Sequence, residues 1–229
     1  MNHRHALSIV GPNGCGKGTT CSYLGQLGAH VMAMSDILGE YSKKKPEAGK
    51  IIHEYKVEKK VNVPDPVVAD AMIWKLGPLF RQVHSGLFGL DGYGRGPEQI
   101  KLLAEWISQR NEHYQRIDRP TIKTGYVFFT LSLDETLRRV EKRIEEFRKL
   151  GKTPRTEDLG EHPVRRYEEY QALEQRLIET ARSVVGHVSI IDLGTLTTLE
   201  AAAHIYAMAY EVEPDEISLR LRSRLAEVA

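Results

Sequence analysis

The chain has 229 residues, of which 41% are hydrophobic, enough for one core with small inserts. Its 32 Lys and Arg residues balance 31 Asp and Glu residues, so bulk charge indicates neither a nucleic-acid partner nor a membrane surface. No apolar run approaches membrane-spanning length and no signal-peptide core is expected, so we predict a cytoplasmic protein. Cys15 and Cys21 are expected to be free thiols, and without a CxxC pair no structural zinc site is expected.

A glycine-rich loop at residues 11–19 follows a short apolar run, residues 6–10, and precedes a predicted helix. Its spacing is G-x-x-x-x-G-K, with Lys17 after the last loop glycine; Gly18 stands where the general pattern has Ser or Thr, and Thr19 carries the hydroxyl instead. Glycine allows successive backbone N–H groups to point at one anion, and the helix N-terminus adds positive charge. We therefore predict a phosphate-binding loop; the alternative is a tight turn.

The rest of the chain alternates between short apolar strands and helices. Further strands are predicted at 30–34, 87–91, 125–132 and 188–193, and helices at 37–43, 67–83, 97–113, 133–147, 164–185, 198–210 and 215–228. This alternation predicts an α/β fold, a five-stranded parallel sheet with helices on both faces. Ligands of such sheets bind at the carboxyl ends of the strands. The residues expected to converge there are the glycine loop, Ser35-Asp36, Asp91 and Asp192.

Several helix starts carry residues that typically cap helices. The expected caps are Ser35-Asp36, Asp65 followed by Pro66, a box of Ser132 with Glu135, and Thr197 with Glu200. Behind Ser132, apolar side chains at helical spacing predict a packed stripe of Leu133, Leu137, Val140, Ile144 and Phe147.

Charged residues near the predicted strand ends suggest phosphate chemistry. Asp91 ends a strand, where a carboxylate can hold Mg²⁺ directly or through water; the alternative is a turn cap. Arg139 and Arg143 are four residues apart and share one helix face, and Arg155 and Arg166 follow. Each arginine alone is typical of a solvated surface, but phosphoryl transfer needs cations around the moving group, and Arg binds phosphate bidentately.

These residues carry a resemblance to the adenylate kinase family that spans about residues 6–210. The loop at 11–19 resembles the family's G-x-P-G-x-G-K-G-T, with Pro one place early, and D-G-Y-G-R at 91–95 with Gln99 resembles D-G-F-P-R…Q. Further elements are similar to its lid-flanking arginines, its R-x-D-D…R element and its D-G-T turn: Arg139-x-x-x-Arg143, Arg155-x-Glu157-Asp158, Arg166 and Asp192-Leu193-Gly194-Thr195.

The resemblance implies a P-loop nucleoside monophosphate kinase fold in one domain, 1–229. It implies a flap for the monophosphate at 36–64 and a short lid without zinc ligands at 144–157, and a terminal helix follows at 214–229. ATP would be held by Gly14, Cys15, Gly16, Lys17, Gly18, Thr19 and Arg139. Catalytic cations would be Lys17, Arg95, Arg143, Arg155 and Arg166. The monophosphate would meet Met34, Ser35, Gly39, Val63, Arg95 and Gln99, and Mg²⁺ would enter with ATP, with Asp91 in its outer shell through water.

The resemblance further implies reversible transfer of the ATP γ-phosphoryl group to AMP by a monomer whose partners are small-molecule nucleotides. The acceptor side departs from the family pattern: Met34 replaces a Thr, Gly39 replaces the acceptor-phosphate Arg, and Gly94 replaces a Pro. Lys43, one turn beyond Gly39, is our hypothesis for the missing charge. Two alternatives stay open, namely the same chemistry on CMP, UMP or dAMP, and a nucleotide-sensing module with little turnover.

Overall fold

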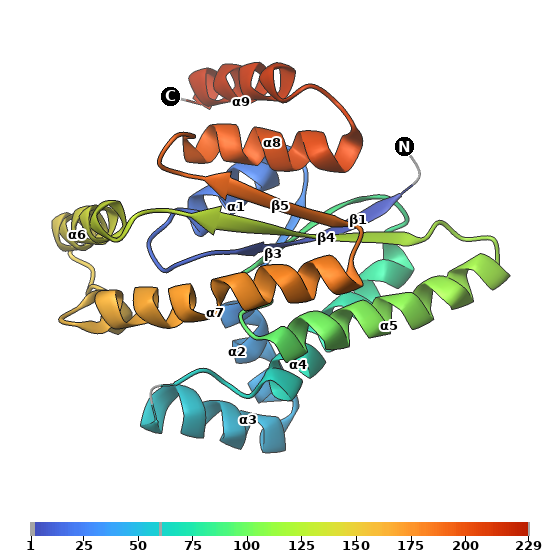
Figure 1. Cartoon of the computed structure of the whole chain (residues 1–229), viewed down its shortest axis with the longest axis horizontal. Helices are drawn as coiled ribbons and strands as arrows, with labels where there is room; N and C mark the ends of the chain where they lie inside the picture. The colour runs from blue at the N-terminus through green and yellow to red at the C-terminus, as the bar shows by residue number, and fades with distance from the viewer. Residues whose placement is uncertain (1–2, 60, 229) are drawn as a thin grey trace.

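The computed structural model describes residues 3–59 and 61–228. Its strands form one sheet in the order β2-β3-β1-β4-β5, and every neighbouring pair is parallel. The predicted α/β fold with a five-stranded parallel sheet is therefore confirmed (Figure 1). The strands are β1 (Arg4–Val10), β2 (His30–Ala33), β3 (Gly86–Asp91), β4 (Ile122–Thr130) and β5 (His187–Asp192).

Helices cover both faces of this sheet. In Figure 1, α8 and α9 lie above the sheet, and α4, α5 and α7 lie below it. No helix in the described part of the chain has the length and apolar character needed to cross a membrane. The helices are α1 (Lys17–Gln26), α2 (Met34–Lys44), α3 (Pro46–His53), α4 (Asp65–Gln82), α5 (Pro97–Arg116), α6 (Leu133–Lys149), α7 (His162–Val184), α8 (Thr198–Tyr210) and α9 (Pro214–Val228), with short turns of helix at Glu54–Glu58 and Thr156–Asp158.

The central strands β3, β1 and β4 are buried on both faces over most of their length, so most of their side chains are apolar. Successive side chains point to opposite faces, so Leu87 packs into the core cluster with α1 and α8, whereas Phe88 packs into the cluster with α4 and α5. Both side chains are fully buried. Burying a side chain of this size contributes about 1.5–3 kcal/mol, so the two clusters anchor β3 from both faces.

Two predicted helix caps are wrong. Helix α2 begins at Met34, so Ser35 lies inside its first turn, where its hydroxyl faces the Asp36 carboxylate at 3.3 Å. Helix α4 is preceded by Pro64, and Asp65 is its first residue; among the described residues no side chain caps that end. The Asp65 carboxylate instead accepts a hydrogen bond from Gln99 Nε2 at 2.7 Å, a long-range contact that competes with local capping.

The other two caps form, one of them incompletely. Thr197 and Glu200 make a full capping box at the start of α8. Ser132 accepts from the Glu135 backbone N–H at 3.3 Å, but the Glu135 carboxylate binds arginines instead of returning to Ser132. The second half of the predicted box is therefore replaced by ion pairs.

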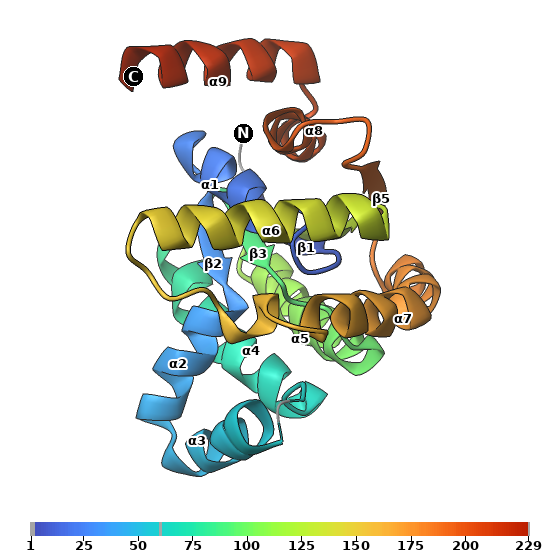
Figure 2. The same cartoon turned by 90° about the vertical axis from the view of Figure 1, so that its left-hand side faces the viewer.

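Helix α6 buries fewer apolar side chains than its predicted apolar stripe implied. Of the five stripe residues only Val140 is buried. Figure 2 looks onto the carboxyl ends of the strands and shows α6 lying across them, with α2 and α3 below it. Because α6 crosses the ends of the strands instead of covering a sheet face, most of its stripe stays partly exposed and Val140 alone reaches deep into the interior.

The chain ends in a helix that closes the upper layer. Ile217 and Leu221 of α9 are buried in the core cluster shared with α1 and α8. Arg224 donates to the backbone carbonyl of Gln26, at the end of α1. The predicted terminal helix is therefore present and packs on the core. Both cysteines are buried free thiols, as predicted.

Candidate active site

The glycine-rich loop lies between β1 and α1, the strand–loop–helix arrangement that its spacing predicted. Gly14 and Gly16 have φ angles of 84° and 110°, in the left-handed region that favours glycine. There is also no room for larger residues, because a Cβ on Gly14 would lie 2.7 Å from Val140 of α6 and one on Gly16 would lie 2.6 Å from Thr198 of α8. Two helices therefore enclose the loop and hold its shape.

Lys17 lies inside this loop. Its side chain is 7% exposed, and its Nζ donates to the carbonyls of Gly11 and Pro12 at 2.8 Å and 2.7 Å. Burial lowers the pKa of Lys17, and the neighbouring Cys15 and Asp91 oppose this effect. The ammonium group is thus positioned beside backbone N–H groups at the start of α1, where phosphate oxygens can replace the two carbonyls as its partners.

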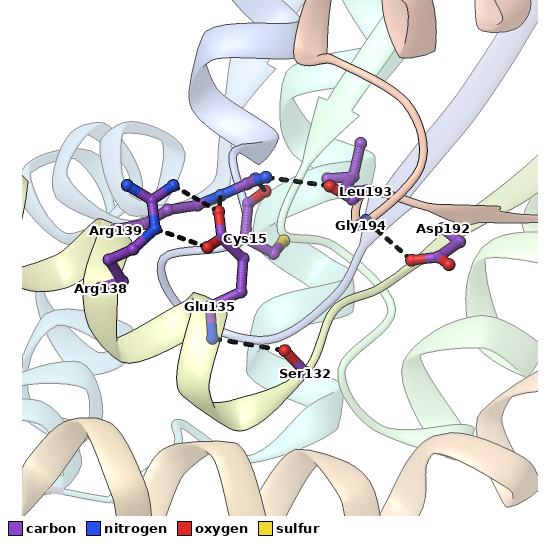
Figure 3. A network of polar contacts seen from close by, with 8 residues as sticks. All are labelled: Cys15, Ser132, Glu135, Arg138, Arg139, Asp192, Leu193 and Gly194. Atoms are coloured by element: carbon purple, nitrogen blue, oxygen red, sulfur yellow. Dashed lines mark hydrogen bonds and ion pairs between the residues drawn. The ribbon is translucent and has the colours of Figure 1, made fainter.

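Arg139 joins three parts of the site. Its guanidinium donates to the Cys15 carbonyl at 2.7 Å, to the Leu193 carbonyl at 2.9 Å and to Glu135 Oε1 at 2.8 Å (Figure 3). Hydrogen bonds from Arg138 and Arg139 lower the pKa of Glu135 to about 2. The network fixes α6 against the glycine loop and the turn after β5, so a cation borders the loop before any ligand is bound.

Asp91 ends β3 and faces the first turn of α1. A Cβ on Gly18 would lie 3.9 Å from Asp91 Oδ2, and the Thr19 hydroxyl belongs to an exposed residue on the same turn. Burial raises the pKa of Asp91, while the charges of Lys17, Arg95 and Arg155 oppose the rise. A carboxylate and a hydroxyl beside a phosphate loop suit Mg²⁺, which keeps several waters and takes phosphate oxygens as further ligands.

That donor set does not hold a metal by itself. Among residues 3–59 and 61–228, no group of three or more His, Cys, Asp or Glu side chains is arranged to bind one.

A cleft opens beside the glycine loop and brings together segments that are far apart in the sequence. Arg95 and Arg166 line it together with loop residues 11–13 and with Asn62 of the insert. Two of the sequence-predicted arginines thus meet the loop, as expected for a common site at the carboxyl ends of the strands. Asp192 was expected here too, but its carboxylate accepts from the Gly194 N–H at 2.8 Å within its own turn (Figure 3).

The remaining predicted cations have different surroundings. Arg143 makes a two-pronged ion pair with Asp158, with Nε 2.9 Å from Oδ2 and Nη2 bonded to Oδ1. The Asp158 side chain is only 2% exposed, so this pair fixes the connection between α6 and α7. Arg155 is exposed, and its charge acts on Asp91.

The residues predicted to bind a monophosphate differ in how deeply they are buried. Met34 and Val63 are buried in the same apolar cluster, whereas Ser35 and Gly39 are exposed. A Cβ on Gly39 would meet no atom within 4 Å, so space is open where the acceptor-phosphate arginine was expected. Lys43, one turn further along α2, is also exposed.

Gln99 lies at the start of α5 and is only 4% exposed. Its Oε1 accepts from the backbone N–H groups of Gly94 and Arg95 at 3.1 Å and 3.2 Å, and its Nε2 donates to Asp65. The side chain therefore braces the loop that carries Arg95, in addition to the base contact predicted for it.

Sequence reasoning missed two carboxylates in this region. Glu135 stands four residues before Arg139, a helical spacing that could have revealed the pair. Asp65 and Gln99 are 34 positions apart and belong to different helices, so no local pattern pointed to their contact.

These features define a class of protein, an α/β protein with a fold consistent with a P-loop kinase. The chain is similar to an adenylate kinase from Bartonella bacilliformis, with 27% identity over 166 residues that cover 72% of this chain and 80% of that enzyme. No family model matches the chain. The similarity is that of a distant relative.

Proposed function

We propose that this protein is a nucleoside monophosphate kinase that reversibly transfers the γ-phosphoryl group of Mg-ATP to AMP, ATP + AMP = 2 ADP. The observation that carries the proposal is the cleft in which Arg95 and Arg166 face the glycine loop. Phosphoryl transfer depends on positioning and on charge stabilisation, and this cleft places two cations beside the loop. The similarity to an adenylate kinase supports the same reaction class.

In the proposed mechanism Lys17 and the loop N–H groups hold the phosphates of ATP, and Arg139 borders the base. Arg95 and Arg166 stabilise the charge that develops on the transferred group, joined by Arg143 and Arg155 when the lid, 144–157, closes. No general base is needed because the attacking phosphate is already ionised. When Mg²⁺ is bound it neutralises charge on the ATP phosphates, and Asp91, with Thr19, would hold it through water.

Closure of the flap, 36–64, and the lid would exclude water and protect ATP from hydrolysis. We assign the reaction to a monomer in the cytoplasm.

A second candidate is the same chemistry on another monophosphate, CMP, UMP or dAMP. The open space beside Gly39 favours it, because the arginine expected to bind the acceptor phosphate is absent. If no cation replaces it, a third candidate follows, a nucleotide-sensing module that binds ATP with little turnover.

Turnover with Mg-ATP, measured separately against AMP, dAMP, GMP, CMP and UMP, tests the proposal. We expect the highest kcat/KM with AMP. A clear preference for another monophosphate would support the second candidate. Tight ATP binding without transfer to any acceptor would refute the kinase proposal and support the sensing module.

A further inference from the structure

The glycine loop makes a tight turn over residues 12–15, and Asn13 is the second residue of that turn. The Cys15 N–H donates to the Pro12 carbonyl at 3.4 Å, and Gly14 has a φ of 84°, as the third residue of a type II turn does. Proline is common at the second place because its ring fixes φ in advance. In the motif G-x-P-G-x-G-K-G-T, which this loop resembles, proline occupies that place, whereas this chain has Asn13. The turn by itself therefore does not account for an asparagine.

Neither of the usual reasons for asparagine in a turn applies to Asn13. Asparagine favours turns because it tolerates a positive φ, or because its side chain bonds the backbone two residues further on. Asn13 has a negative φ, and within residues 3–59 and 61–228 its carboxamide makes no hydrogen bond. Its two amide N–H groups and its carbonyl oxygen thus have no structural task in the loop.

This carboxamide borders the cleft. Asn13 is partly buried and lines the cleft together with Arg95 and Arg166. Lys17 is instead bonded inside the loop, to the carbonyls of residues 11 and 12. A neutral hydrogen-bond donor therefore lies with two guanidinium groups where the loop opens into the cleft.

We infer that Asn13 is a further catalytic residue, whose amide N–H donates to an oxygen of the phosphoryl group in transfer. This inference rests on the proposed kinase function. In that reaction an oxygen of the AMP phosphate forms a bond to the γ-phosphorus of ATP, and the bond from that phosphorus to the β,γ-bridging oxygen breaks. The electron pair of the broken bond leaves with ADP, two ADP molecules result, and no proton is transferred.

The direction of transfer explains why this bond acts on the rate. Negative charge on the three equatorial oxygens moves with the phosphorus from ADP toward the acceptor, and so away from Lys17 and the loop N–H groups. Asn13 borders the cleft beside Arg95 and Arg166, so its hydrogen bond strengthens as the group moves into the cleft. An interaction that is stronger in the transition state than in the bound substrates raises kcat more than it lowers KM.

The test compares the steady-state kinetics of the wild type, Asn13→Ala and Asn13→Asp. Loss of a hydrogen bond to a charged group should lower kcat about 10–100-fold in Asn13→Ala, while the KM values for ATP and AMP change less than about threefold. Asn13→Asp keeps the shape, but its carboxylate repels the phosphoryl oxygens, so its kcat should be lower still. A merely structural role predicts the opposite order, because aspartate favours turns as asparagine does.

A second substitution separates the side chain from the turn. Asn13→Pro supplies the residue common at this place, so the unfolding temperature should stay the same or rise while kcat falls as far as in Asn13→Ala. Gln115→Ala, which removes an exposed carboxamide from α5, is the control and should behave like the wild type.

Three results would overturn the inference: a wild-type kcat in Asn13→Ala or Asn13→Pro, changes confined to the KM values, or a higher kcat in Asn13→Asp than in Asn13→Ala. If the wild type phosphorylates no acceptor, the proposed function fails and binding decides the inference separately. The probe is then Mg-ADP with aluminium fluoride and AMP, a combination that mimics the phosphoryl group in transfer. Weaker calorimetric binding to Asn13→Ala than to the wild type would support the inference, and equal binding would overturn it.

Discussion

The glycine loop and the insert at 36–64, the proposed flap side, are built differently. On the loop side, Lys17 is bonded to two carbonyls, Arg139 ties the loop to two other segments, and glycines fit against α6 and α8 with no spare space. On the flap side, Gly39 is surrounded by open space and Lys43 is exposed. The glycine loop is thus held in place by contacts within the protein, whereas Gly39 and Lys43 of the insert are exposed.

This difference indicates where selection among ligands takes place. A preorganised loop stabilises the phosphates of any nucleoside triphosphate. The triphosphate group is the same in all of them, and the loop does not have to rearrange to bind it. In the proposed mechanism the insert at 36–64 binds the acceptor, so we expect the departures at positions 34 and 39 to alter the choice of acceptor more than the binding of ATP. The variants below test this difference between the glycine loop and the insert, beginning with the largest expected effect.

The largest effect is expected from Lys17→Ala. Removing the loop cation deletes charged hydrogen bonds to phosphate, each worth about 1.5–3 kcal/mol, so kcat/KM should fall at least about 100-fold. Steady-state kinetics and thermal unfolding measure the two consequences separately. Lys44→Ala, an exposed lysine on α2, is the control and should behave like the wild type. Near-native turnover in Lys17→Ala would refute the assignment of this loop.

Arg139→Met should weaken the loop side next. The change removes hydrogen bonds to Cys15, Leu193 and Glu135, so the KM for ATP should rise about tenfold and the free energy of unfolding should fall by about 1–3 kcal/mol. Arg138→Met is the matched control, because Arg138 binds the same Glu135 but makes no hydrogen bond to the loop. Equal effects of the two variants would contradict the bracing role of Arg139.

Gly39→Arg is expected to strengthen acceptor binding by adding the missing positive charge. Among the described residues nothing lies within 4 Å of a Cβ at 39, so the substitution creates no clash at that atom. The acceptor KM should fall about tenfold while the ATP KM stays constant. Kinetics with varied acceptor measure both constants. An unchanged acceptor KM would show that the acceptor phosphate does not approach position 39.

Lys43→Ala completes this test. If Lys43 supplies the charge, its removal should raise the acceptor KM in the wild-type background and have a smaller effect beside Arg at position 39, a coupling that a double-mutant cycle measures. An unchanged KM in Lys43→Ala would contradict the hypothesis.

The smallest effect concerns pH. The pKa of Glu135 is about 2 in the folded protein, below its usual value of 4.5, because Arg138 and Arg139 donate to it. A depressed carboxyl pKa stabilises the folded state above about pH 4.5, and this contribution is lost as the pH falls toward 2. Glu135→Gln should therefore unfold at a lower temperature than the wild type at pH 7, with the difference shrinking below pH 4.5. A constant difference across this range would contradict the ionic origin of the effect.

The sequence by itself determined the parallel sheet, the loop–helix connection and most helix positions, because apolar periodicity, glycine spacing and the box of Thr197 with Glu200 are local signals. It also indicated that arginines gather near the loop. The sequence did not show that Arg166 lines the cleft whereas Arg143 pairs with Asp158.

Only the tertiary structure decided which polar groups are partners over long distances in the chain. Arg4 is fully buried, donates to the carbonyls of Phe80 and Pro120, and lies over the Tyr114 ring at 4.3 Å, although its position in the first strand showed no sign of this. Asp65 was predicted to cap its own helix and instead binds Gln99. Packing brings such groups together across dozens of residues, and a buried donor or acceptor takes whichever partner the fold places beside it, since leaving it unpaired costs about 1–3 kcal/mol.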